Sequence, residues 1–278
     1  MPDKYLIQKS SGEKQHYSVE KLHNSLRLAG ASKETISFII SEIEKDLSGG
    51  ITTRNIYKKA FRLLRQKQHS IAARYSLKNA IMELGPTGYP FEKFVGELFK
   101  MQGFKVEVGI IVDGRCVTHE VDVVARTKKL TIMVECKYHN TAGKICNIQV
   151  PLYIKSRFDD IRTVLMKQPQ ENNKTFEGWV VTNTRFSGDA EQYGRCAGLH
   201  LVGWDYPQIG SLKNLIENTG LFPVTALAGL NKRQKQQLID NDIILCRDLQ
   251  NNPELIELLH LPPKVASRVM TEVRELCG

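Results

Sequence analysis

The first stretch of the chain holds two short segments with a strand-like pattern of apolar and polar positions, and then changes to a helical period. Residues 5–9 and a segment that ends at Tyr17 are strand-like, and the polar residues 10–13 between them predict a turn. Ser18 is a preferred N-cap residue, so a helix is predicted from there to Ala29. The sequence therefore opens with a small hairpin followed by a helix.

Helical periodicity continues to the first strong break in the chain. Apolar side chains recur every three or four positions over 33–47. Thr52 or Thr53 is placed to cap a third helix, and Ser70 to cap a fourth that ends near Leu84. The next six residues, Gly-Pro-Thr-Gly-Tyr-Pro, cannot continue a helix. The first part is therefore predicted to be a hairpin with about four helices.

A different pattern follows this break, with one amphipathic helix before a series of strands. Residues 91–102 place their apolar side chains on one helical face, and Gly103 stands at a C-cap position. Strands are predicted over 104–111, 120–125 and 130–137, a helix from Gln149, and then a strand, a helix and a last strand between 178 and 203. This pattern predicts an α/β arrangement for the middle part.

A weaker break near residues 218–223 precedes a short stretch of helical segments. The fold class is therefore predicted to be multidomain α/β. We expect a helical domain over 1–85, an α/β/α core over 86–220 and a small all-α domain over 221–278.

Positive charge is concentrated in the first part. The chain has 39 Lys and Arg against 30 Asp and Glu, a net charge of +9, and residues 1–90 hold 15 of the basic and 8 of the acidic residues. This balance favours a polyanionic partner, either nucleic acid or a nucleotide. A basic surface that serves only solubility is the alternative.

The composition excludes several classes of protein. With 41% hydrophobic and 25% charged residues, the chain can form apolar cores and is not a disordered sequence. No apolar run approaches the roughly 18 to 20 residues of a membrane span, and no signal peptide pattern is present. The six Cys residues are scattered without a CxxC motif, which excludes a zinc ribbon and fits free thiols in a reducing compartment. We therefore expect a cytoplasmic protein.

The first part resembles the ATP-cone, the nucleotide-binding regulatory module of ribonucleotide reductases and their repressor. The resemblance is carried by Lys9 and Gly12 of the hairpin and by the segments 17–22, 52–56 and 73–75. The family usually has Lys-Arg-Asp-Gly where this chain has Lys-Ser-Ser-Gly. The resemblance implies that this part binds an adenine nucleotide, most naturally ATP.

Four residues are the predicted nucleotide ligands. Lys9 and Lys21 are point charges suited to phosphates, and a helix N-terminus at Thr53 adds backbone donors. Arg74 belongs to the last segment of the resemblance. The chain lacks the GxxxxGK[ST] motif, so ATP is expected to act as a regulatory ligand rather than as fuel. The alternative is that these residues are only solvated surface charges.

Three charged residues of the middle part lie in or near the ends of apolar strands. Glu135 and Lys137 are two residues apart, so they share one face of a strand, and a hairpin brings Asp122 alongside them. Carboxylates in this position are costly unless they bind a cation or find partners. Oxygen ligands suit Mg²⁺ or Mn²⁺, and a lysine beside the metal can orient or activate a water molecule. The pattern predicts a divalent metal site.

The spacing of these residues is that of the PD-(D/E)xK nucleases. Residues 91–205 resemble the Mrr-like restriction endonuclease domain, which is related to Holliday-junction resolvases, and the segment 178–187 adds to this resemblance. It implies a restriction-endonuclease-like fold and Mg²⁺-dependent hydrolysis of DNA. The implied roles are Asp122 and Glu135 as metal ligands with the backbone carbonyl of Cys136, Lys137 on the water, Glu92 as support for the metal or its waters, and Gln149 as an orienting residue. Glu97 is the alternative to Glu92, and incidental carboxylates on an inactive fold are the alternative to the whole site.

The last part resembles a tandem helix-hairpin-helix domain, whose hairpins contact the DNA backbone through amides near a glycine. The first hairpin keeps Gly229, with Lys232 and Arg233 close behind, whereas the second has His260 where a glycine is expected. Residues 221–278 carry no net charge, with 7 basic and 7 acidic residues. DNA binding and a packing or dimerisation role therefore both stay open.

Together these observations predict a metal-dependent DNA endonuclease that is regulated by ATP. The alternatives are a non-enzymatic, nucleotide-responsive DNA-binding regulator and an accessory protein of nucleotide metabolism. DNA and an adenine nucleotide are the expected partners. A homodimer or higher homo-oligomer is also expected, because nucleases that cut both strands with one site per chain often pair.

Overall fold

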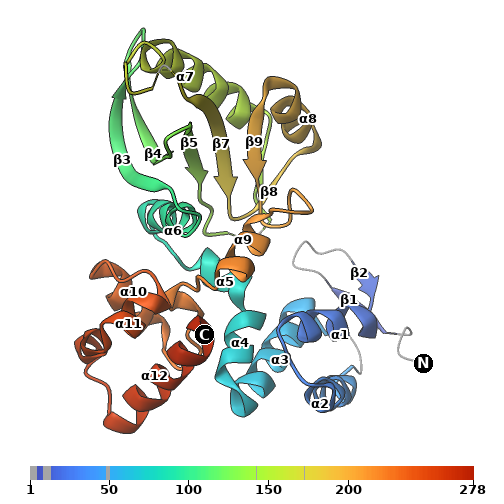
Figure 1. Ribbon diagram of the computed structural model, residues 1–278. Helices are drawn as coiled ribbons and strands as arrows, with labels where there is room; N and C mark the ends of the chain where they lie inside the picture. The colour runs from blue at the N-terminus through green and yellow to red at the C-terminus, as the bar shows by residue number, and fades with distance from the viewer. Residues whose placement is uncertain (1–4, 9–13, 48–50, 142, 172) are drawn as a thin grey trace.

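The computed structural model describes residues 5–8, 14–47, 51–141, 143–171 and 173–278. A mixed β-sheet occupies one end of the molecule, and helices from the two ends of the chain occupy the other (Figure 1). The five strands lie in the order β3-β4-β5-β7-β9. Their bounds are Lys105–Asp113 for β3, Thr118–Arg126 for β4, Leu130–Lys137 for β5, Thr175–Thr182 for β7 and Leu199–Val202 for β9. The first three strands pair antiparallel and the last three parallel.

Helices cover both faces of this sheet. On one face lies α6 (Tyr89–Lys100), and on the other lie α7 (Gln149–Leu165) and α8 (Gly188–Ala197). Helix α9 (Leu212–Thr219) packs against α6. Alternate strand residues point to the two faces, so Val134 joins the core under α6 and Met133 the core under α7. A short parallel pair, β6 (Ile145–Cys146) with β8 (Arg185–Phe186), lies beside the sheet. The predicted α/β/α core is confirmed.

The first part has the predicted hairpin and helices. The elements are β1 (Leu6–Gln8), β2 (Lys14–His16), α1 (Val19–Leu28), α2 (Lys33–Glu44), α3 (Thr53–Lys67), α4 (His69–Tyr75) and α5 (Leu77–Met82). Ser18 and Thr52 accept hydrogen bonds as N-caps of α1 and α3. The predicted cap at Ser70 is wrong, because the extended residue Gln68 already separates α3 from α4 and Ser70 lies buried inside α4.

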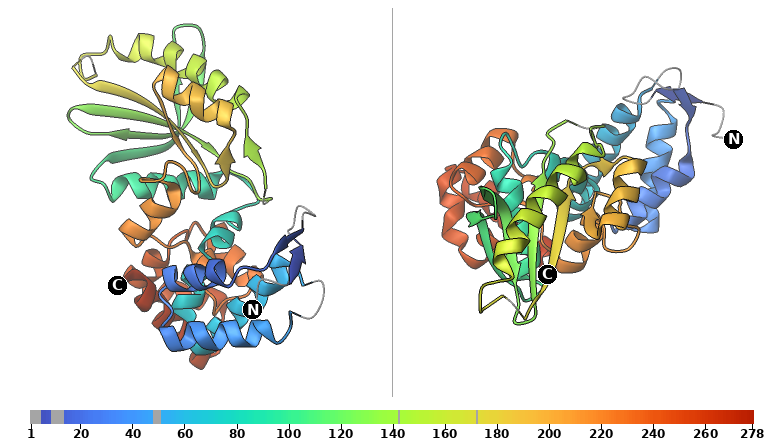
Figure 2. Two further views of the ribbon diagram at one scale, coloured as in Figure 1. Left: turned by 90° about the vertical axis from the view of Figure 1, so that its right-hand side faces the viewer. Right: turned by 90° about the horizontal axis from the view of Figure 1, so that it is seen from above.

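The last part is helical, as predicted. It consists of the short 3-10 helix η2 (Val224–Ala226), then α10 (Lys232–Asp240), α11 (Cys246–Asn251), the 3-10 helix η3 (Pro253–Leu259) and α12 (Pro263–Cys277). These helices pack beside α4 and α5 rather than apart from them, as both views in Figure 2 show. The Thr225 hydroxyl donates to the Ala80 carbonyl oxygen across this contact, at 2.7 Å.

One apolar core runs through all three predicted parts. It joins Ile81 of α5, Phe91 of α6, Val134 of β5 and Val273 of α12. A second core holds the hairpin and α1 to α3, with Ala228 from the last part. The turn at Gly85–Pro86 therefore changes the direction of the chain without ending a core. In the residues that the structure describes, no helix has the length and apolar character needed to cross a membrane.

Candidate active site

The candidate site lies where β4 and β5 separate. Their ladder pairs Arg126 with Thr131 and ends at the pair of Val123 and Val134. Asp122 and Glu135 come next on the two strands, outside the ladder. Beyond the end of the ladder, the Asp122 side chain bonds to the neighbouring strand: its Oδ2 accepts the Cys136 backbone N–H at 2.7 Å. The antiparallel register thus places the two carboxylates at the opening between the strands.

Glu135 is held by two cations. Its side chain is 6% exposed; Oε1 lies 2.5 Å from Nζ of Lys137, and Oε2 lies 2.6 Å from Nη1 of Arg157. Arg157 comes from α7 and also donates to the carbonyl oxygen of Glu120. Each oxygen of the buried carboxylate is therefore paired with a cation. This pairing offsets the cost of removing the charge from water.

Glu92 joins this group from the first turn of α6. Burial, together with the charges of Asp122, Glu120 and Glu135, raises its pKa to about 7, although Lys137 opposes this shift. Burial, with the charge of Glu135, likewise raises the pKa of Asp122 to about 6. Carboxylates are thus crowded here, and an added cation would relieve their repulsion.

Glu97, the alternative to Glu92, pairs with Lys100 on its own helix, with Nζ 2.5 Å from Oε1. Cys136 is buried on the α6 side of β5, and burial raises the pKa of its thiol. Its thiol therefore packs in the core and leaves only its main chain at the site.

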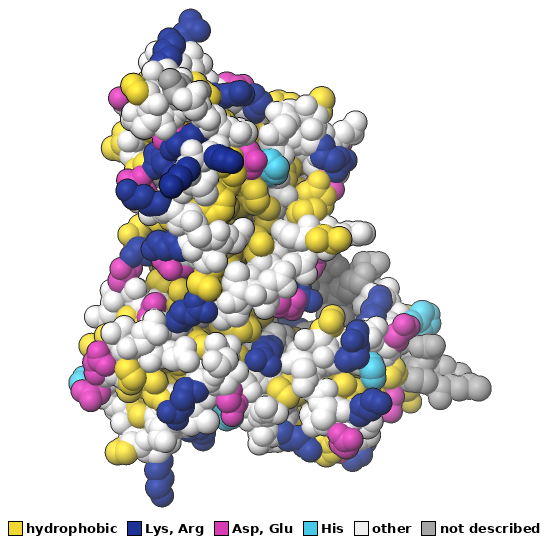
Figure 3. Space-filling view, viewed as in Figure 1, with side chains coloured by type: hydrophobic (Ala, Val, Ile, Leu, Met, Phe, Trp, Pro, Cys, Tyr) yellow, Lys and Arg dark blue, Asp and Glu magenta, His cyan; other side chains and the backbone are white. Residues whose placement is uncertain are grey.

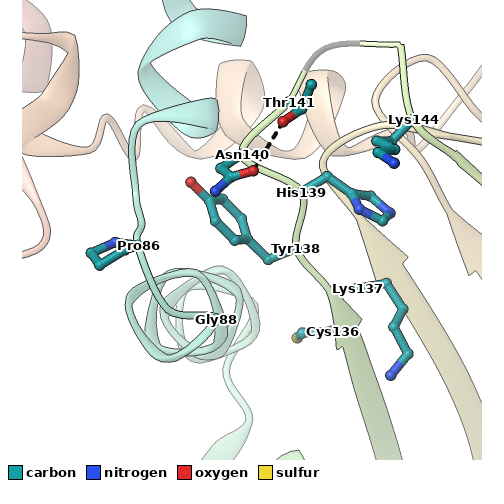
Figure 4. Close-up of a pocket in the computed structure, with 9 residues that line it drawn as sticks. All are labelled: Pro86, Gly88, Cys136, Lys137, Tyr138, His139, Asn140, Thr141 and Lys144. Carbon is teal, nitrogen blue, oxygen red and sulfur yellow. Dashed lines mark hydrogen bonds between the residues drawn. The ribbon is translucent and has the colours of Figure 1, made fainter.

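A cavity of about 380 Å³ opens beside Lys137 (Figure 4). Lys137, His139 and Lys144 project on one side of the chain segment that leaves β5, and Tyr138 projects on the other. Asn183 holds this segment in place through two hydrogen bonds. Its Oδ1 accepts the His139 backbone N–H at 2.9 Å, and its Nδ2 donates to the His139 carbonyl oxygen at 2.7 Å. The lining of the cavity is therefore basic, and the two hydrogen bonds to Asn183 hold the main chain of the lining segment in place.

The donor atoms fit a hard divalent cation. Two carboxylates and the Cys136 carbonyl supply oxygen ligands, and Mg²⁺ typically takes one or two carboxylates with water and substrate oxygens around them. Throughout the described residues, no group of three or more His, Cys, Asp and Glu side chains is arranged to hold a metal ion. The protein by itself would thus fill only part of the coordination sphere.

Gln149 begins α7, as predicted, but it is exposed. Its side-chain oxygen lies 3.4 Å from Nδ2 of Asn147, and no hydrogen bond joins it to the carboxylates among the described residues. Two residues at the site were missed: Arg157 and Asn183. Arg157 lies about two helical turns after Gln149, but its contact with Glu135 depends on how α7 packs on the sheet, which no sequence signal gives. Asn183 lies within the segment 178–187, where only its strand pattern was used.

The predicted nucleotide ligands fall in different places. Lys9 lies outside the described residues. Lys21 and Arg74 line one cavity of about 410 Å³. Thr53 is the first residue of α3 and is not part of that lining; its neighbour Thr52 forms a bridge with Gln8 of the hairpin. The structure thus brings Lys21 and Arg74 together and leaves Thr53 apart from them.

The Gly229 amide points inward. It donates to Oε2 of Glu272 at 2.9 Å, while the Ala228 amide donates to the other oxygen, and Glu272 is 2% exposed. That amide is therefore not available to a DNA phosphate in this structure. Lys232 and Arg233 line an open groove on α10. His260 has φ +47°, the left-handed conformation for which glycine is favoured.

Comparisons with known proteins match two parts of the chain. Residues 85–209 match the family model Mrr_cat, described as restriction endonuclease, and residues 222–277 match the AF1548-like C-terminal model. An uncharacterized protein of Archaeoglobus fulgidus is 32% identical over 185 residues, which are 66% of this chain and 100% of that protein. The predicted restriction endonuclease domain is thereby confirmed, and the last part is an AF1548-like C-terminal domain.

Two solved structures align with the chain. The crystal structure of AF1548, a protein of unknown function, aligns with a TM-score of 0.55 and 31% identity over 69% of this chain and 99% of that one. The MspJI restriction endonuclease in complex with a 27-mer oligonucleotide aligns with a TM-score of 0.31 and 12% identity, over 72% of this chain and 39% of that one.

Proposed function

Since the chain belongs to the AF1548-like family and carries a restriction endonuclease domain, we propose that it is a DNA endonuclease that depends on a divalent cation. The observation that carries this proposal is the group of Asp122, Glu135 and Lys137 where β4 and β5 separate. A purely structural ion pair would not need a second, crowded carboxylate beside it. The group is therefore better explained by chemistry than by stability.

The metal would be held by Asp122, Glu135 and the Cys136 carbonyl, with Glu92 directed at its water ligands. A bound Mg²⁺ or Mn²⁺ supplies electrostatic stabilisation for the charge that develops on the phosphate under attack. In the reaction, a water oxygen bonds to phosphorus while one P–O ester bond breaks, and the leaving oxygen takes up a proton from solvent water. Lys137 orients the water and donates to a phosphate oxygen. Glu92, with a pKa of about 7, accepts a proton near neutral pH.

The basic lining of the cavity supports DNA as the substrate. Lys137 and Lys144 border the opening, and the Lys137 ammonium lies 2.5 Å from Oε1 of Glu135. Lysine ammonium groups bind phosphates, so this lining supports binding to the DNA backbone rather than sequence recognition. On α10, Lys232 and Arg233 offer a second place for DNA phosphates.

We also propose that the first part works as an ATP-cone, which binds an adenine nucleotide and controls cleavage without hydrolysing it. Its hairpin and helices, the excess of basic residues and the shared cavity of Lys21 and Arg74 support this. A homodimer would allow both DNA strands to be cut. Nucleotide binding and dimerisation would control when cleavage occurs and would leave the chemistry at Asp122 unchanged.

Cleavage of supercoiled plasmid tests the central proposal. The chain should nick or linearise DNA with Mg²⁺ or Mn²⁺ and be inactive in EDTA, and Asp122→Ala should lose at least about 100-fold in rate. Glu97→Ala is the matched control on α6 and should keep full activity. Full cleavage by a folded Asp122→Ala protein would overturn this active site. DNA binding without cleavage under any metal condition would favour the nucleotide-responsive regulator instead.

A further inference from the structure

The cavity of about 410 Å³ that contains Lys21 and Arg74 lies at the junction between the first part and the sheet domain. Its walls come from α1, α4, α5, α9 and the segment after β9. Figure 1 shows α5 and α9 at the waist of the molecule, between the sheet and the helices of the chain's first part. A ligand in this cavity would therefore touch both sides of the junction.

Positive charge dominates the lining of this cavity. Lys21, Arg74, Lys78 and Lys213 face one carboxylate, that of Glu217. Lys213 is 3.8 Å from Glu217, and the guanidinium of Arg74 donates to a neutral acceptor, the carbonyl oxygen of Glu275, at 3.3 Å. Lys78 also interacts with the carboxylate of Asp205, so four basic side chains stand against two carboxylates. This excess of positive charge fits an anionic ligand carrying several charges.

An apolar wall stands beside these charges. Trp204 and Tyr75 line it together with Leu28, and the Lys78 ammonium lies 5.6 Å from the centroid of the Trp204 ring. Trp204 is 6% exposed and Tyr75 is half-buried against Tyr57, so only their exposed parts offer an apolar contact to a heterocyclic base, while Lys and Arg accept phosphates. The volume is within the range of small-molecule sites, about 300–1,000 Å³.

We propose that this junction cavity binds a nucleoside polyphosphate, with its phosphates on Lys21, Arg74, Lys78 and Lys213 and its base against Trp204. The inference rests on the proposed nucleotide control and names its site. It adds residues from outside the first part, Trp204 and Lys213, to Lys21, Arg74 and Lys78, which line the cavity from within it. A nucleotide bound in this cavity would therefore contact the sheet domain directly.

A chain of hydrogen bonds leads from this cavity to the active site. The backbone N–H of Trp204 donates to the Thr184 carbonyl oxygen at 2.7 Å, and the Thr184 and Thr182 hydroxyls are 3.1 Å apart. The Thr182 hydroxyl donates to the Lys137 carbonyl oxygen at 2.7 Å. Both threonines are buried. A ligand that binds two states of this path with different affinity therefore shifts the position of Lys137.

The fluorescence of Trp204 gives a direct test on the full chain. The chain has two Trp residues, so Trp179→Phe leaves Trp204 as the single emitter. Titration with ATP should change this emission, and Lys78→Met and Lys213→Met should each weaken the binding at least about tenfold. Lys264→Met, an exposed lysine on α12, is the control and should bind ATP as the parent does. If Trp179→Phe does not fold, calorimetry with ATP replaces fluorescence, and the same lysine variants are then made in the chain that keeps Trp179.

Each outcome separates this inference from the others. ATP binding that is indifferent to Lys78→Met and Lys213→Met overturns the junction site but keeps nucleotide control. No binding at millimolar ATP overturns both, while plasmid cleavage with Mg²⁺ remains a separate readout of the nuclease. A single-stranded oligonucleotide is the second probe, because it offers the same phosphates and bases. A Trp204 response to the oligonucleotide and not to ATP would also overturn the inference.

Discussion

Arg157 of α7 binds Glu135 of β5 through Nη1 and Oε2, 2.6 Å apart, with side chains that are only 13% and 6% exposed. Lys137 occupies the other carboxylate oxygen at 2.5 Å. Both oxygens of a predicted metal ligand are therefore engaged by cations when no metal is bound. A metal ion at this site must share or displace one of them, so Arg157 sets how readily Glu135 becomes a ligand.

Replacing Arg157 by Ala should destabilise the metal-free protein, because a buried carboxylate loses one of its two cations. We expect a loss of about 1–3 kcal/mol in the free energy of unfolding. Mg²⁺ should restore part of this loss, since it supplies the missing charge. Denaturant unfolding in EDTA and in Mg²⁺ measures both effects. Arg162→Ala, on the same helix, is the control, and an Arg157→Ala protein as stable as the parent in EDTA would contradict the role given to this pair.

The raised pKa values of Glu92 and Asp122 predict that stability falls as pH rises. The values are about 7 and 6 in the folded chain, against 4.5 and 3.8 for the free groups. Folding therefore disfavours the charged forms: stability is fully present below about pH 4 and is lost as pH rises through the folded values, by roughly 1–3 kcal/mol.

Mg²⁺ should oppose this loss by neutralising the same carboxylates, so it should raise Tm more at about pH 8 than at about pH 5. Thermal unfolding at both pH values, in EDTA and in Mg²⁺, provides the measurement. The double variant Glu92→Gln with Asp122→Asn should show neither the pH effect nor the Mg²⁺ effect. An equal Mg²⁺ effect at both pH values would argue against metal binding by these carboxylates.

Glu272→Ala should be strongly destabilising, although this residue lies far from the active site. It removes the acceptor of two backbone amides, those of Ala228 and Gly229, in a buried position. Each unsatisfied amide costs about 1–3 kcal/mol, so a loss of about 2–5 kcal/mol is expected in chemical unfolding. Glu275→Ala, exposed on the same helix, should change stability by less than about 0.5 kcal/mol. Similar values for the two variants would mean that Glu272 does not hold this loop.

DNA binding by the last part is best tested without deleting it, because α12 shares a core with α6. Lys232→Ser with Arg233→Ser should weaken DNA binding and reduce the slope of log affinity against log salt by about 2. Lys264→Ser with Arg268→Ser removes the same charge from α12 as a control. Equal slopes for all proteins in a salt series would leave the last part with a packing role alone.

The sequence predicts strands and their register where the strands are close together along the chain. Alternation predicted β4 and β5, and a hairpin between them has one favourable register, which puts Asp122 opposite Glu135. Arg157 was not predictable in the same way. Its contact with Glu135 depends on how α7 packs across the sheet, and nothing in the local sequence fixes that packing.

The limits of local rules are also visible at Ser70 and Gly229. Ser70 has the right residue type for a cap, but the backbone turns at Gln68, and the burial of Ser70 in α4 decides its environment. Gly229 matches a hairpin motif, yet its amide bonds to a carboxylate 43 residues away. In both cases a tertiary contact overrides a preference that is valid for an isolated segment.

The apolar core that joins α6 to α12 also bears on biosynthesis. Phe91 and Phe94 of α6 flank Glu92, and they belong to the same core as Val269 and Val273 of α12. On the ribosome, α12 emerges only after the whole sheet has been made. The apolar side chains that α12 covers therefore stay exposed until translation has passed α12. A chain truncated before α12 would keep this part of the core exposed and would be prone to proteolysis.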